Sequence, residues 1–203
     1  MTKVKLCGLK RPCDIEYANE LMPDFIGFVF ASKSRRFVSY DEAENLRKKL
    51  NEDITPVGVF VNEPIENIVY LVNKNIIGMV QLHGSEDNDY IKELRSKVNC
   101  PIIQAFHIET EQDIAKAEKS EADLIMLDSG GGTGETFNHS LISNINRDFF
   151  LAGGLDSENV CDAISKFKPY AVDASSSLET DGAKDKDKIT AFVKAVRNGG
   201  QIK

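Results

Sequence analysis

The chain has 203 residues, with 25 Lys and Arg against 32 Asp and Glu, which gives a formal net charge of −7. An acidic surface repels phosphate backbones and anionic headgroups, so this charge argues against a nucleic-acid-binding or membrane-surface protein. Hydrophobic residues make up 41% and charged residues 28% of the sequence, a balance typical of a globular protein rather than of a disordered chain.

Eight short apolar runs recur along the chain from one end to the other. They are apolar on both faces rather than alternating, which is typical of parallel strands buried on both sides of a sheet. The predicted strands are Val4–Leu6, Phe25–Phe30, Val57–Val61, Met79–Leu82, Ile102–Phe106, Leu124–Leu127, Phe149–Leu151 and Ala171–Asp173.

Amphipathic segments lie between these runs, as expected for helices that cover a sheet. Ser39 or Asp41 is expected to cap the second helix, and Pro64 to occupy the first position of the third. A further helix is expected after Phe137, where the pattern is weakest. The other predicted helices are Cys13–Leu21, Tyr40–Leu50, Pro64–Asn73, Glu86–Lys97, Glu111–Lys119, Asp156–Lys166 and Lys186–Arg197.

Alternating strands and helices predict an α/β fold, a single-domain (βα)8 TIM barrel that spans residues 1–203. Eight units in this length leave about 25 residues for each, close to the lower limit for a barrel. An open, doubly wound sheet is the alternative, because the repetition alone does not separate the two folds. The first strand–helix turn, at residues 7–10, has no GxGxxG pattern, which argues against a dinucleotide-binding version.

The sequence has none of the features of a membrane or secreted protein. Its longest apolar run, Phe25–Ala31, has seven residues, whereas a membrane helix needs about 20. Charged residues interrupt the N-terminal segment, so it does not resemble a secretion signal. Reduced thiols and a cytoplasmic location are expected, because the cysteines show neither a CxxC pattern nor zinc-ligand spacing. They are Cys7, Cys13, Cys100 and Cys161.

Polar and reactive residues collect at the predicted carboxyl ends of the strands, where barrel enzymes build their active sites. This pattern predicts one shared pocket. For each residue a structural role is the alternative: a buried filler for a cysteine, a helix cap for an aspartate, a solvated charge for an arginine. The candidates are Cys7, Arg36, His83, Asp128 and Asp173.

The three histidines do not form a set of metal ligands, so no metal site is predicted. With Arg35 beside Arg36, the sequence does not decide which of the two side chains faces inward. His83 is equally compatible with a packed, hydrogen-bonding role. His107 and His139 are the other two histidines.

Small residues follow the seventh and eighth strands, at Gly153-Gly154 and Ser175-Ser176. Such residues let backbone N–H groups approach a phosphate closely, and these are the two loops at which barrels bind phosphate. Tight turns are the alternative interpretation for either pair. The glycine-rich stretch 130–134 lacks the lysine of a P-loop and is expected to form a lid or binding loop.

Taken together, these segments resemble the phosphoribosylanthranilate isomerase family. The resemblance runs along essentially the whole chain, and each motif falls at a strand end. The motifs are KLCGL at 5–9, GFVFASKSRRFV at 27–38, VGVFVN at 57–62, VQLHGSE at 80–86, LDSGGGTGETFN at 127–138, LAGGLDSENV at 151–160 and VDASSSLETDGAKD at 172–185.

The resemblance implies an Amadori rearrangement of N-(5-phosphoribosyl)anthranilate in tryptophan biosynthesis, without a cofactor. By motif, Cys7 corresponds to the general base and Asp128 to the general acid. Arg36 corresponds to the arginine that contacts the anthranilate group and Asp173 to a substrate-contacting carboxylate, while His83 lies near the pocket. Positive charge near Cys7 would favour the thiolate that a base requires.

The sequence departs from the family pattern at two places. Ser177 stands where the family usually has glycine, so it either adds a hydroxyl donor or strains a turn, and Ser177→Gly is expected to be neutral or mildly stabilising. Asn138-His139 replaces the usual Asp-Trp after the phenylalanine of the lid.

Two other classes of function remain as alternatives. The first is another phosphate-binding barrel isomerase or epimerase, such as the related isomerase of histidine biosynthesis, but that enzyme uses a pair of aspartates where this chain has Cys7. The second is a catalytically silent barrel that binds a metabolite or a protein, against which the presence of both Cys7 and Asp128 argues. The expected partner is a small phosphorylated substrate, with the chain acting as a monomer or homodimer.

Overall fold

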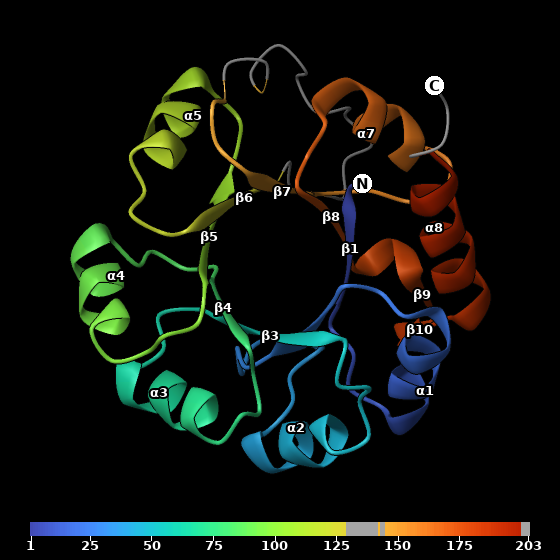
Figure 1. Ribbon diagram of the computed structural model, residues 1–203, viewed down its shortest axis with the longest axis horizontal. Coiled ribbons are helices and arrows are strands. Elements are labelled where there is room, and N and C mark those ends of the chain that lie inside the picture. The colour runs from blue at the N-terminus through green and yellow to red at the C-terminus, as the bar shows by residue number, and fades with distance from the viewer. Residues whose placement is uncertain (129–141, 143–144, 200–203) are drawn as a thin grey trace.

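The structure is a computed structural model in which residues 1–128, 142 and 145–199 are described. Eight parallel strands form a closed barrel in chain order, and β8 pairs with β1 to complete it (Figure 1). The closed barrel confirms the predicted fold and excludes the open sheet. The strands are β1 (Lys3–Cys7), β2 (Phe25–Val29), β3 (Thr55–Phe60), β4 (Met79–Leu82), β5 (Ile102–His107), β6 (Leu124–Asp128), β7 (Phe149–Ala152) and β8 (Ala171–Ala174).

Helices surround the barrel as an outer ring (Figure 1). Each described helix overlaps a predicted one, and the ends differ by a few residues. None of them is both long enough and apolar enough to cross a membrane. The helix expected after Phe137, the stretch 130–134 and Asn138-His139 lie outside the described residues. The described helices are α1 (Pro12–Leu21), α2 (Tyr40–Arg47), α3 (Ile65–Asn73), α4 (Asn88–Arg95), α5 (Glu111–Glu118), α7 (Val160–Phe167) and α8 (Lys186–Gly199).

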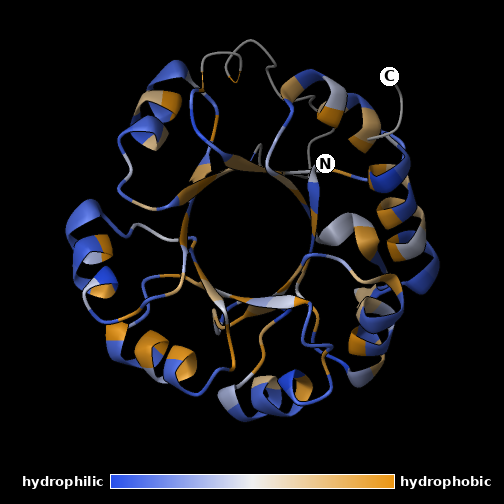
Figure 2. Ribbon diagram, in the orientation of Figure 1, coloured by the Kyte–Doolittle hydropathy of each residue, from blue (hydrophilic) through white to orange (hydrophobic). Residues whose placement is uncertain are grey.

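Strand side chains point alternately into the barrel and out toward the helices. The outward set, which includes Leu6, Ile26 and Phe28, packs against the apolar stripes of the helices. The inward set, which includes Phe25 and Phe150, fills the barrel interior. Figure 2 shows hydrophobic colour on the strands and on parts of each helix, with hydrophilic colour elsewhere on the helices. Burial on both sides explains why the strand sequences are apolar on both faces.

A local side-chain contact fixes where helix α2 begins. At α2 the Ser39 hydroxyl accepts a hydrogen bond from the Glu42 N–H, and the Glu42 carboxylate accepts one from the Ser39 N–H at 2.8 Å. This reciprocal pair is a capping box, so Ser39 is the cap and Asp41 belongs to the first turn. Helix α3 begins at Ile65, which makes Pro64 its cap rather than its first residue.

A short hairpin follows β8 and was not among the predicted elements. After the 3-10 helix η1 (Ser176–Leu178), β9 (Glu179–Thr180) pairs antiparallel with β10 (Ala183–Lys184). Asp181 and Gly182 between them have φ of 51° and 79°, and two successive positive φ values are typical of a type I′ turn. The hairpin places Glu179 and Lys184 beside the barrel mouth.

Candidate active site

A cavity of about 350 Å³ opens at the carboxyl ends of the strands. The structure brings all nine residues predicted for the site around this one cavity, although they come from six strands or the loops after them. This is the arrangement that a closed parallel barrel produces, because every strand ends at the same face. The nine are Cys7, Arg36, His83, Asp128, Gly153, Gly154, Asp173, Ser175 and Ser176.

Cys7 is the last residue of β1, and its thiol is buried at the cavity wall. Its register partner on β2 is Gly27. A Cβ atom at Gly27 would lie 2.7 Å from the Cys7 Sγ, too close for a real contact. The glycine therefore leaves the space that the sulfur occupies. On the other side, the Ser175 hydroxyl donates to the Cys7 carbonyl at 3.1 Å and ties the end of β1 to the loop after β8.

Lys5 lies two residues before Cys7 on the same face of β1. Its Nζ donates to the Asp173 Oδ1 at 2.9 Å, and both side chains are buried. Burial raises the pKa of the Cys7 thiol, while Lys5 acts in the opposite direction. Burial likewise raises the pKa of Asp173, again opposed by Lys5. Asp173, predicted to contact substrate, thus lines the cavity and holds the Lys5 ammonium as well.

Asp128 ends β6, three strands around the barrel from Cys7, with β7 and β8 between the two strands. Its Oδ2 lies 3.7 Å from the Nε2 of His83, at the end of β4. The other ring nitrogen of His83 lies 2.9 Å from the Gln81 Nε2. Gln81 is buried, and its Oε1 has no hydrogen-bond partner among the described residues. The amide of Gln81 thereby orients the imidazole toward Asp128.

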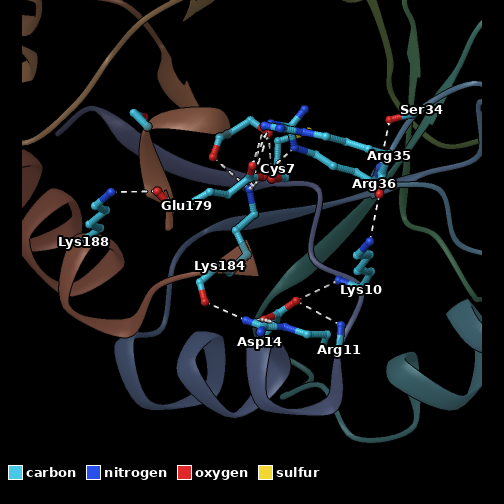
Figure 3. Close-up of polar contacts among 12 residues, drawn as sticks. Cys7, Lys10, Arg11, Asp14, Ser34, Arg35, Arg36, Glu179, Lys184 and Lys188 are labelled. Carbon is cyan, nitrogen blue, oxygen red and sulfur yellow. Dashed lines mark hydrogen bonds and ion pairs between the residues drawn. The ribbon is translucent and has the colours of Figure 1, made fainter. Parts of the chain in front are cut away.

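The side chains of the two arginines after β2 run side by side toward the charged cluster at Glu179 (Figure 3), but they differ in exposure. The Arg36 side chain is 20% exposed and lines the cavity, whereas that of Arg35 is 61% exposed. The Arg36 N–H donates to the Ser34 hydroxyl at 3.1 Å, and Lys10 donates to the Arg35 carbonyl at 2.8 Å, which fixes the loop. Both guanidinium groups reach Glu179: Arg36 through Nε at 2.6 Å and Arg35 through a terminal nitrogen at 2.7 Å.

Glu179 is the centre of a charged cluster beneath these arginines. The buried Lys184 donates to its Oε1 at 2.9 Å and to the Ser175 carbonyl at 2.8 Å. Burial alone would raise the pKa of Glu179, but hydrogen bonds from Arg36 and Lys184 outweigh it and hold that pKa below its ordinary value. Burial lowers the pKa of Lys184. The hairpin thus links the Arg36 loop to the loop after β8.

The loops after β7 and β8 meet at one rim of the cavity. Gly153 and Gly154 have φ of 96° and 65°, a region that favours glycine, and a Cβ at Gly154 would meet no atom within 4 Å. The Ser177 hydroxyl donates to the Leu155 carbonyl and joins the two loops. Ser177 has no positive φ, so the turn does not require glycine there. The expectation for Ser177→Gly is corrected: the change removes this hydrogen bond and relieves no strain.

Sequence reasoning missed four side chains of the site: Lys5, Gln81, Glu179 and Lys184. Lys5 was detectable as a charge inside an apolar strand, two residues from a candidate base. The Asp-Gly pair at 181–182 marks a hairpin turn, which would have brought its two flanking charged residues together. Within the described residues no group of three His, Cys, Asp or Glu side chains is placed to hold a metal ion.

The fold and the cavity define the class: a (βα)8-barrel enzyme with a thiol, a carboxyl group and two small-residue loops around one cavity. A comparison with protein families identifies the member of this class. The family model described as N-(5'phosphoribosyl)anthranilate (PRA) isomerase matches residues 4–195. The chain therefore belongs to the N-(5'-phosphoribosyl)anthranilate isomerase family, which confirms the resemblance found in the sequence.

Individual relatives agree with this assignment. The chain is 40% identical to the N-(5'-phosphoribosyl)anthranilate isomerase of Endomicrobium trichonymphae, over 98% of this chain and 100% of that protein. A solved phosphoribosyl anthranilate isomerase in complex with reduced 1-(o-carboxyphenylamino)-1-deoxyribulose 5-phosphate is 35% identical and superposes with a TM-score of 0.88, covering 98% and 100% of the two chains. Monomers generated from the dimeric Thermotoga maritima enzyme are 34% identical, with a TM-score of 0.87 and the same coverage.

Proposed function

We propose that the chain converts N-(5'-phosphoribosyl)anthranilate to 1-(2-carboxyphenylamino)-1-deoxyribulose 5-phosphate, with Cys7 as general base and Asp128 as general acid. The observation that carries the assignment of these roles is the placement of the two groups in the lining of one cavity, on strands that are three apart around the barrel. Membership of the isomerase family supports the reaction itself. The product belongs to tryptophan biosynthesis.

The rearrangement needs two proton transfers at different atoms of the sugar. Asp128 donates a proton to the ring oxygen, the bond between that oxygen and C1 breaks, and the anthranilate nitrogen forms a Schiff base with C1. The Cys7 thiolate then removes the proton from C2, and the electron pair of that C–H bond neutralises the iminium nitrogen to give an enolamine. Tautomerisation of the enolamine gives the ketose. An acid and a base that line the same cavity from different strands can act on different atoms of one bound sugar.

The remaining site residues bind the two ends of the substrate. Arg36 contacts the anthranilate carboxylate: Glu179 takes the guanidinium edge formed by Nε and one terminal nitrogen, and the opposite edge carries further N–H donors. The backbone N–H groups of Gly154 and of the Ser175-Ser176 segment bind the phosphate. His83 and Asp173 contact the ribose between them.

This activity would be carried out in the cytoplasm, by a monomer or a homodimer. All four cysteines are free thiols in the structure, which fits a reducing compartment. The Thermotoga maritima relative is recorded both as a dimer and in monomeric form. Either assembly leaves the cavity inside a single barrel, so the site would be complete in each chain.

The decisive experiment measures turnover of freshly prepared N-(5'-phosphoribosyl)anthranilate through the loss of substrate fluorescence. Cys7→Ala and Asp128→Asn are each expected to lower kcat by about 10²–10⁴-fold, because each removes one proton transfer. Circular dichroism and the midpoint of thermal unfolding should change little. Matched controls are Cys13→Ala and Asp89→Asn, a thiol and a carboxylate away from the cavity, which should keep full activity.

Two outcomes would contradict the assignment of roles. Normal turnover by Cys7→Ala would show that the base is another group. Unfolding of that variant would favour the interpretation of Cys7 as a buried filler. If the wild-type chain leaves the substrate unchanged but binds it, the barrel is the catalytically silent alternative.

A further inference from the structure

Lys5 is the most deeply buried charged residue in the part of the chain that the structure describes. Its side chain is 0% exposed, and β1 and β8 place it directly opposite Asp173 in the register of the barrel. Burying a lysine costs desolvation free energy, and a protein with a hydrophobic pair in place of a buried ion pair is often at least as stable. Stability alone therefore does not explain a charge at this position of an otherwise apolar strand.

Geometry gives Lys5 a second neighbour besides Asp173. Side chains two residues apart on a strand share one face, so Lys5 and Cys7 both point into the barrel. The ammonium also acts electrostatically on the thiol, where it opposes the rise in the pKa of Cys7 that burial causes. Because the ammonium is held 2.9 Å from the Asp173 carboxylate, it has a fixed position on the inward face of β1 that it shares with Cys7.

We propose that Lys5, held in place by Asp173, is the positioning residue that stabilises the thiolate of Cys7. This inference rests on the proposed function, in which Cys7 acts as a base. A thiolate buried among apolar groups loses the hydration that stabilises it in water, so a nearby fixed cation must replace that hydration. Where water is excluded, such a cation stabilises the thiolate far more than a cation at the protein surface would.

The other charged groups that affect the pKa of Cys7 either stabilise the thiolate less than Lys5 does or destabilise it. Lys184, from β10, also favours the thiolate, but less than Lys5 does. Asp173, from β8, disfavours the thiolate. Lys184 is engaged by Glu179 and by the Ser175 carbonyl. Lys5 is thus the cation on which the charge state of Cys7 depends most.

The test measures the thiol directly, without substrate. The purified chain is treated with iodoacetamide between pH 6 and pH 10, and mass spectrometry follows alkylation of the peptide that contains Cys7. Only the thiolate reacts, so the rate reports the thiol pKa. Lys5→Met is expected to move the profile up by at least about one pH unit, which slows alkylation about tenfold at neutral pH. The control is Lys3→Met, on the same face of β1 and away from the sulfur, which should leave the profile unchanged.

Activity provides a second measurement that a merely structural role would not affect. In Lys5→Met the alkaline shift should also appear in the pH dependence of kcat, so that activity recovers partly as the pH rises, with KM nearly constant. A structural defect would instead lower kcat by the same factor at every pH. An unchanged alkylation profile for Lys5→Met overturns the inference.

A second pair of variants guards against loss of folding. Lys5→Met leaves Asp173 unpaired, whereas Lys5→Met combined with Asp173→Asn removes both charges and avoids a lone buried carboxylate. Compared with Asp173→Asn alone, the double variant should react more slowly at neutral pH, and equal rates overturn the inference. Because alkylation needs no catalysis, its result is separate from that of Cys7→Ala, which tests the proposed function.

Discussion

Arg35 and Arg36 are adjacent in sequence and share Glu179, yet only one of them lines the cavity. Arg36→Ala is expected to raise KM about 10- to 100-fold, because it removes a charge-assisted contact to the substrate carboxylate. Arg35→Ala should change KM less than about twofold, since an exposed guanidinium contributes little. Steady-state kinetics on the two variants measure both effects.

The comparison between the two arginines is its own control, because both substitutions remove a contact to Glu179. If the two variants raised KM equally, the effect would come from the loss of that shared contact. The assignment of Arg36 to the anthranilate carboxylate would then be wrong.

The loops after β7 and β8 act as a pair, so their prediction belongs to the scale of elements. Gly154→Val is expected to raise KM at least about tenfold, because a branched side chain keeps the phosphate away from the backbone N–H groups. The acid–base pair is untouched, so kcat should fall much less. Kinetics with the natural substrate give both constants.

Gly182→Val is the matched control for this change. Gly182 has a φ of 79°, similar to the 65° of Gly154, and neither glycine has another atom within 4 Å of an added Cβ. Both substitutions therefore introduce the same kind of backbone strain, but only Gly154 lies on the cavity. A comparable rise in KM in both variants would argue that strain, rather than obstruction of the phosphate, is the cause.

The sequence predicted well the strands that are buried on both faces. Runs apolar on both faces mark every barrel strand, and the predicted ends differ from the observed ones by at most two residues, as at Lys3 and Thr55. Helix α7 begins at Val160 rather than Asp156, because Asp156 accepts hydrogen bonds from the N–H groups of Glu158 and Asn159 in a turn before it. The hairpin of β9 and β10 was not predicted, because strands of two residues are too short to show a periodic pattern.

In the candidate site, too, some features can be predicted from local sequence, whereas others depend on the closed barrel. Residues such as Cys7 and Asp128 were predictable, because a strand end is visible in the sequence. The contacts between side chains of different elements were not. The contact between Lys5 and Asp173 depends on the register of β1 against β8, and that between Arg36 and Glu179 depends on an unpredicted hairpin.

At the scale of the whole molecule, Glu179 is expected to make stability depend on acidity. Its folded-state pKa lies below the ordinary value, so its contribution is fully present above about pH 5 and is lost as the pH falls through the folded-state pKa. Glu179→Gln should lower the free energy of unfolding by about 2 kcal/mol at pH 7, because Lys184 loses its buried partner. Urea unfolding from pH 3 to pH 7 measures the difference from wild type.

That difference should shrink steadily below about pH 4, where the wild-type carboxylate is itself protonated. Glu44→Gln is the control, because the Glu44–Lys48 pair is exposed to solvent and should contribute little at any pH. A difference that stayed constant with pH would mean that Glu179 stabilises the fold through packing rather than through its charge.

Closure of the barrel by β1 and β8 has a consequence for synthesis of the chain. The first strand leaves the ribosome carrying Lys5, but the carboxylate that neutralises it is 168 residues further along. Until β8 has emerged, burial of β1 would leave an uncompensated ammonium inside the protein, at a cost of several kcal/mol. The nascent chain therefore gains little by docking its first strand early. The reactive cysteine at the end of that strand becomes enclosed only after β8 has emerged.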